Sequence, residues 1–110
     1  MAKGYIIGLI KFTDREQFIE TFAKEIGPFL ARNGGKILTR TSHTHAHEGH
    51  SHDLNVIVEF EDYEQAKNMM GMSEWEKLQM HRRAHSDPEA GSFMLLEEGD
   101  AVGTAFGSQG

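Results

Sequence analysis

Residues 5–12 read YIIGLIKF, and this stretch decides the fold because it is apolar on both sides of an extended chain. Successive side chains of a β-strand point to opposite faces of the sheet. One face would carry Tyr5, Ile7 and Leu9, and the other Ile6, Ile10 and Phe12. A strand with two apolar faces belongs inside a layered structure, so we expect helices on one face and a second cover on the other.

A helix is predicted over residues 15–32, directly after this strand. Apolar residues recur there at steps of three and four, which is the stripe of an amphipathic helix. Asp14 stands where an N-cap is needed, and Asn33-Gly34-Gly35 supplies a permissive end. Proline removes one helical amide and crowds the preceding turn, so Gly27-Pro28 predicts a kink or a restart of the helix.

The remaining elements complete a simple order. Residues 36–41 and 54–60 are predicted to be strands paired as an antiparallel hairpin, and residues 93–97 a short final strand. Helices are expected at 63–70 and 73–84, broken at Gly71, with Trp75, Leu78 and Met80 facing inward. The order βαββαβ predicts an α+β, ferredoxin-like fold: a four-stranded antiparallel sheet with helices on one face. We expect one domain over residues 1–100 and a flexible tail over 101–110.

The apolar second face of the first strand predicts a homodimer, because a second copy of the sheet is the simplest cover. The chain has 11 basic and 17 acidic residues, a net charge of -6 that disfavours nucleic acid and anionic membranes as partners. Cysteine is absent, which excludes disulfides and thiolate metal sites. The N-terminus does not read as a secretion signal, and no run of about 18 apolar residues occurs, so we expect a cytoplasmic protein.

Four short stretches of the chain are familiar: Gly4-Tyr5, residues 34–40, residues 58–60 and residues 72–75 (MSEW). With them the chain resembles the bacterial family called domain of unknown function 1330, over about residues 3 to 99. The resemblance implies a dimeric α+β barrel, in which two ferredoxin-like sheets pack face to face around a shared cavity. By the same resemblance Arg40, Glu59 and Arg82 fall on polar positions typical of the family, to which no reaction is generally assigned.

A histidine-rich loop, residues 42–53, links the two strands of the predicted hairpin. It holds five of the seven histidines, together with Glu48 and Asp53. Short histidine-rich tracts are typical of metal binding, and neutral imidazoles suit zinc, nickel and copper. The predicted ligands of a divalent metal are His43, His45, His47, His50 and His52. A solvated loop with adventitious affinity and a pH-responsive loop are the alternatives.

The register of the hairpin bears on this site. If Arg40 lies opposite Glu59, then His47 lies opposite His52 and His43 opposite Val56. Four imidazoles would then share one face of an extended hairpin. A slip of one residue would move the histidine of the second strand to the other face.

Arg40 and Glu59 are also candidates for a ligand or catalytic site, because charge is uncommon inside strands. Glu59 would serve as general acid or base and Arg40 would bind an anionic group, with Arg82 as a third polar residue of the cavity between sheets. A structural ion pair between Arg40 and Glu59 is the alternative.

Other features have simpler interpretations. His81 and His85 stand four apart near a helix end, where a role toward the helix dipole is expected, and the methionines are expected to fill the core. No nucleophile and base arrangement, phosphate loop or dinucleotide motif is present, so no organic cofactor is implied. Three functions therefore remain. The first is a homodimeric barrel whose loop binds zinc, nickel or copper, and the second is a small-molecule-binding or catalytic barrel in which the loop is incidental. The third is an interaction module that uses the dimer and the tail.

Overall fold

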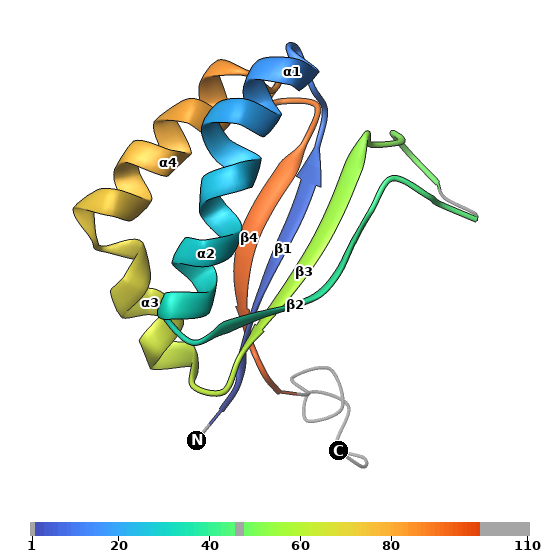
Figure 1. Ribbon diagram of the computed structural model, residues 1–110. Helices are drawn as coiled ribbons and strands as arrows, with labels where there is room; N and C mark the ends of the chain where they lie inside the picture. Colours follow the sequence, from blue (N-terminus) through green and yellow to red (C-terminus); the bar gives the residue numbers. More distant parts are fainter. Residues whose placement is uncertain (1, 46–47, 100–110) are drawn as a thin grey trace.

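A computed structural model describes residues 2–45 and 48–99 of the chain. The sheet has the strand order β2-β3-β1-β4, every neighbouring pair is antiparallel, and the helices lie on one of its faces (Figure 1). In chain order the elements are β1 (Gly4–Ile10), α1 (Arg15–Phe18), η1 (Ile19–Ala23), α2 (Lys24–Arg32), β2 (Gly35–Thr41), β3 (Leu54–Phe60), α3 (Tyr63–Met70), α4 (Ser73–Ala84) and β4 (Ser92–Glu97). This arrangement confirms the predicted ferredoxin-like βαββαβ fold.

The central strand β1 alternates strictly between two environments. Ile6 and Ile10 are buried beneath the helices, whereas Tyr5, Ile7 and Leu9 are half-buried on the face without helices, called the open face here. Beneath the helices lies the hydrophobic core, built from Ile6, Ile10, Phe18, Phe22, Phe29, Leu30, Val58, Phe60, Ala66, Met69, Trp75 and Leu78. The alternation of residues 5–12 therefore predicts correctly which side chains lie on each face of the sheet.

The first helical segment begins where the sequence predicts, but its irregularity lies elsewhere. The carboxylate of Asp14 accepts a hydrogen bond of 3.1 Å from the amide of Gln17, which caps α1. Of the two outcomes predicted at Gly27-Pro28, a kink or a restart, the restart is wrong, since α2 continues through Pro28. Pro28 and Lys24 are both exposed, so water can satisfy the carbonyl that lacks an amide donor. The departure from α-helical geometry is instead the π-helical turn η1.

The second helical region is broken at Gly71, as predicted, with the carboxylate of Asp62 capping α3 through the amide of Glu64 at 3.0 Å. Trp75 and Leu78 are buried, as expected. The inward orientation expected for Met80 is wrong, because its side chain is 66% exposed. Met80 lies five residues after Trp75, so its side chain points about 140° away from that of Trp75 around the helix axis.

The hairpin register expected from the sequence is also wrong. Lys36, not Arg40, lies opposite Glu59, and Arg40 lies opposite Val56, with a β-bulge between Ile37 and Thr39. The start of β2 accounts for this register: Gly35 faces Phe60, and a Cβ at Gly35 would lie 2.9 Å from the Cζ atom of that ring. Only glycine leaves room for the Phe60 ring there, and the bulge then shifts the rest of β2 by one residue.

Beyond the last paired residues of β2, the chain up to residue 45 projects away from the helix layer (Figure 1). The predicted ligand His47 and the predicted tail 101–110 lie outside the described residues. Within residues 2–45 and 48–99, the helices are all too short or too polar to span a bilayer.

Candidate functional site

An apolar cavity of about 50 Å³ lies between the sheet and the helices. Its walls come from all four strands of the sheet on one side and from α1, η1, α2 and α4 on the other. The lining side chains are aliphatic or aromatic with two exceptions, Arg40 and Arg82. Trp75, the single tryptophan of the chain, belongs to this wall, as do Phe18, Phe22 and Phe93.

Arg82, on α4, is the buried charge of this cavity. Its side chain is only 8% exposed, and the guanidinium carbon lies 4.6 Å from the centre of the Phe93 ring, in a cation–π contact. Burial lowers the pKa of Arg82, and the neighbouring Arg83 lowers it further. No carboxylate of the described residues lies within ion-pair distance of it. Arg82 is therefore a partly desolvated cation without a counter-ion among these residues.

Among the described residues, Gln79 is the one side chain hydrogen-bonded to the guanidinium of Arg82. The Nε atom of Arg82 donates a 2.6 Å bond to the Oε1 atom of Gln79. Arginine has no acceptor atom, so this bond fixes which way the amide points. The Nε2 atom of Gln79 is buried and has no acceptor among the described residues. Gln79 is not conspicuous in the sequence, since a glutamine in a helix carries no signal until its burial is known.

Arg40 and Glu59 lie on opposite faces of the sheet. Arg40 pairs with Val56, whose side chain faces the helices, and lines the cavity there. Glu59 alternates with the buried Val58 and Phe60 and therefore belongs to the open face. The expected cross-strand pair between Arg40 and Glu59 is thus wrong, for the same reason as the register.

On the open face Glu59 joins a small polar cluster. Its Oε2 atom lies 3.6 Å from the Nζ atom of Lys3, and Tyr5 is its neighbour on β1. Glu59 is the first cause of a raised pKa of Lys3. Loss of hydration raises the pKa of the Tyr5 phenol, and the Glu59 carboxylate raises it further. An ion pair this exposed contributes little to stability.

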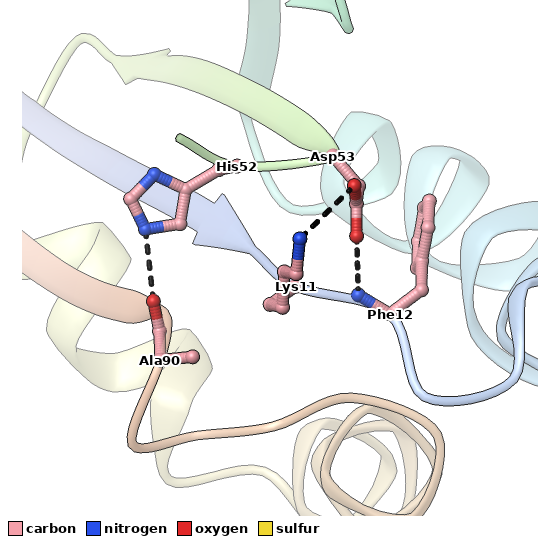
Figure 2. Close-up of polar contacts among 5 residues, drawn as sticks. All are labelled: Lys11, Phe12, His52, Asp53 and Ala90. Atoms are coloured by element: carbon pink, nitrogen blue, oxygen red, sulfur yellow. Dashed lines mark hydrogen bonds and ion pairs between the residues drawn. The ribbon is translucent and has the colours of Figure 1, made fainter. Parts of the chain in front are cut away.

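The base of the histidine loop is anchored to the end of β1 (Figure 2). The Oδ2 atom of Asp53 accepts from the amide of Phe12 at 2.9 Å, and its Oδ1 atom lies 3.7 Å from the Nζ atom of Lys11. The Nε2 atom of His52 lies 3.0 Å from the carbonyl oxygen of Ala90, just before β4. His52 therefore points toward β4, while Asp53 points toward β1.

The other histidines are dispersed. His43, His45 and His50 are exposed, as is His81, and His85 is half-buried. Across the described ranges, no three side chains of histidine, aspartate or glutamate gather closely enough to hold a metal ion. The prediction that four imidazoles share one face of the hairpin assumed a register that differs from the observed one.

Known structures share this fold at low sequence identity. A protein of unknown function from Rhodopseudomonas palustris (RPA0582) is 16% identical with a TM-score of 0.69, covering 88% of this chain and 82% of that one. SnoaB, a cofactor-independent oxygenase from Streptomyces nogalater, is 14% identical with a TM-score of 0.62, covering 87% and 92%. A dimeric protein of unknown function and ferredoxin-like fold from Bacteroides fragilis is 15% identical with a TM-score of 0.56, covering 87% and 96%.

A search of curated proteins found no match of significant similarity. A family model does match, over residues 3–97, which is nearly the whole part of the chain that carries secondary structure. Its match agrees with the resemblance seen in the glycine-rich turn before β2, in β3 and at the start of α4. The chain belongs to the family described as domain of unknown function (DUF1330).

Proposed function

We propose that this protein is a homodimer that binds a small, mainly apolar molecule in the cavity between the helices and the sheet. The observation that carries the proposal is the cavity itself: an apolar space lined by aliphatic and aromatic side chains, with two arginines in its lining. Ligand sites are typically of this kind, with many apolar side chains and few polar groups that orient the ligand. The oxygenase of similar fold supports a ligand-holding role for this architecture.

The π-helical turn η1 supports the same site. It supplies Phe22 and Ala23 to the cavity wall. Single π-helical turns inside helices are frequent at functional sites. The volume of about 50 Å³ has room for only a few water molecules, so a larger ligand requires this wall to move. A wall that already departs from α-helical hydrogen bonding is suited to such a movement.

The homodimer is proposed from the open face of the sheet. Its central row is apolar, because Ile7 pairs with Ile57 on one side and with Met94 on the other. Leu96 and Met94 are 44% and 39% exposed in the single chain. A second copy of the sheet would cover these side chains, and a protein of similar fold is described as dimeric. Glu59, Tyr5 and Lys3 would then lie at the margin of the interface.

Gly8 offers a direct test of the cavity. It lines the cavity, and a Cβ there would meet Phe93 at 3.7 Å, an ordinary van der Waals contact. Gly8→Ala should therefore fill space without strain and preserve or raise the thermal midpoint, because alanine lowers the entropy of the unfolded chain. Binding of small aromatic probes such as benzyl alcohol, followed by Trp75 fluorescence and calorimetry, should weaken by about tenfold or more.

Gly27→Ala is the matched control, since a Cβ at Gly27 meets nothing within 4 Å. Both variants gain from the same glycine-to-alanine effect on the unfolded chain, but only Gly8→Ala occupies the cavity. Equal probe affinity in parent, Gly8→Ala and Gly27→Ala would place binding elsewhere. Absence of any probe binding to the parent would overturn the proposed function.

A second candidate function is metal binding by the histidine loop, favoured by its density of imidazoles and by the geometry of His52. The Ala90 carbonyl can only accept a hydrogen bond, so the Nε2 atom of His52 carries the hydrogen. In the neutral ring the Nδ1 atom then keeps a free lone pair. Ligating histidines commonly donate their other N–H to a carbonyl in this way. The remaining ligands would come from the exposed His43, His45 and His50, together with His47.

Replacing His43, His45 and His47 together with alanine should weaken binding of zinc, nickel or copper by about tenfold or more, because it removes most of the imidazoles. The measurement is calorimetry on untagged protein. The matched control replaces His81 and His85, which should change little. Ligation needs neutral imidazole, so affinity should also fall as the pH is lowered. A parent dissociation constant of only about 1 mM for all three metals would remove this candidate.

A further inference from the structure

The guanidinium of Arg82 is a buried cation without an ion pair among the described residues. Its side chain is nearly buried, its one hydrogen bond shown goes to a neutral amide, and burial already lowers its pKa. A buried charge without a partner is costly, and folded proteins normally pair it. Phe93 offsets part of this cost through its ring face. The remaining N–H groups of the guanidinium fork are suited to an anion that comes from outside the described chain.

Gln79 adds an independent observation that points the same way. Its side chain is 2% exposed, and its Nε2 atom has two hydrogens and no acceptor among the described residues. Buried polar atoms are nearly always hydrogen-bonded, so an orphaned donor calls for an acceptor that is absent here. Arg82 needs the amide oxygen of Gln79 as its acceptor, so the oxygen and nitrogen of this amide cannot exchange places. The Nε2 atom therefore stays without an acceptor among the described residues.

Arg82 can be reached from two spaces. It lines the apolar cavity and also a second, more polar cavity of about 210 Å³. Ile10, Arg82 and Phe93 are common to both linings. A ligand whose polar group contacts Arg82 could therefore place its apolar part in the first cavity. The second, more polar cavity lies on the other side of Arg82.

We propose that the ligand is a small monocarboxylate with an apolar, preferably aromatic body, and that the guanidinium of Arg82, held by its hydrogen bond to Gln79, recognises the carboxylate. This inference rests on the proposed function, because the body must occupy the cavity. A carboxylate matches the planar guanidinium fork and accepts several hydrogen bonds at once. A neutral carbonyl could satisfy Gln79 but would leave the charge of Arg82 uncompensated. The aromatic side chains of Trp75 and Phe93, with ring centres 5.8 Å apart, form the wall beside Arg82.

Benzoate and benzyl alcohol are a matched pair of probes, similar in size and different in charge. Calorimetry on the full chain should show benzoate binding about tenfold or more tightly than benzyl alcohol. Gln79→Glu should supply Arg82 with an internal carboxylate of the same size. It should weaken benzoate binding by about tenfold or more and leave benzyl alcohol within about twofold. Its thermal midpoint should be no lower than that of the parent.

Gln79→Met and Arg82→Gln complete the set. Gln79→Met retains the cation and loses the amide, so benzoate should still bind more tightly than benzyl alcohol. Arg82→Gln removes the cation, so the preference for benzoate should disappear. This variant also tests the inference if Gln79→Glu does not fold. If the parent binds both probes equally, the carboxylate inference is wrong and the apolar cavity stands. If the parent binds neither probe, the proposed function fails and this inference fails with it.

Discussion

Ile7→Glu is expected to convert the proposed homodimer into a monomer. Ile7 lies at the middle of the open face, between Ile57 and Met94 in the two neighbouring strands. In a symmetric dimer each substitution occurs twice, so two carboxylates would be buried in an apolar interface without partners. We expect the association constant to fall by about a hundredfold or more. In a single chain the same position is only half-buried, so folding should be retained.

Sedimentation analysis at micromolar concentration is the measurement, with 12.4 kDa as the mass of one chain. Met80→Glu is the matched control, because Met80 is an exposed apolar side chain on α4, on the helix side of the molecule. It introduces the same charge and should leave the dimer intact. A parent protein that sediments as a single chain would overturn the proposed homodimer, and dissociation by Met80→Glu alone would move the interface to the helices.

Phe60→Ala is expected to cost about 3–5 kcal/mol of folding free energy. Its side chain is fully buried at the end of β3, where the ring lies against Gly35 of β2 and contributes to the hydrophobic core. Removing the ring leaves a cavity. It also removes the contact between Phe60 and Gly35 that sets the register at the start of β2. Since small domains have only about 5–15 kcal/mol of stability, this one change takes a large part of it.

Urea unfolding at a fixed protein concentration measures this loss, because dimer formation would make stability depend on concentration. Phe60→Leu is the control and should cost less than about 1.5 kcal/mol, since it keeps most of the volume. Gly35→Ala places a methyl group 2.9 Å from the Phe60 ring and should be better tolerated with leucine at position 60 than with phenylalanine. A small loss in Phe60→Ala would show that β2 is held by other contacts.

The candidate site could be predicted from the sequence only in part. Arg40 and Glu59 are conspicuous as charges inside strands, and the family resemblance adds Arg82, but the single chain does not bring all three together. Arg40 and Arg82 line the cavity beneath the helices, whereas Glu59 lies on the open face with Tyr5 and Lys3. The observed register of β2 against β3 differs from the expected one by a few residues and includes one β-bulge. This difference separates Arg40 from Glu59. The roles of these three residues and of the histidines remain proposals.

The sequence by itself determined the fold, because its signals are local. The alternation of residues 5–12, the cap at Asp14 and the break at Gly71 each depend on residues a few positions apart, and each is found in the structure. The tertiary structure alone decided the hairpin register, the orphaned amide of Gln79 and the contact between His52 and Ala90. These depend on residues far apart in the chain, such as Gly35 with Phe60, whose packing no periodic pattern encodes.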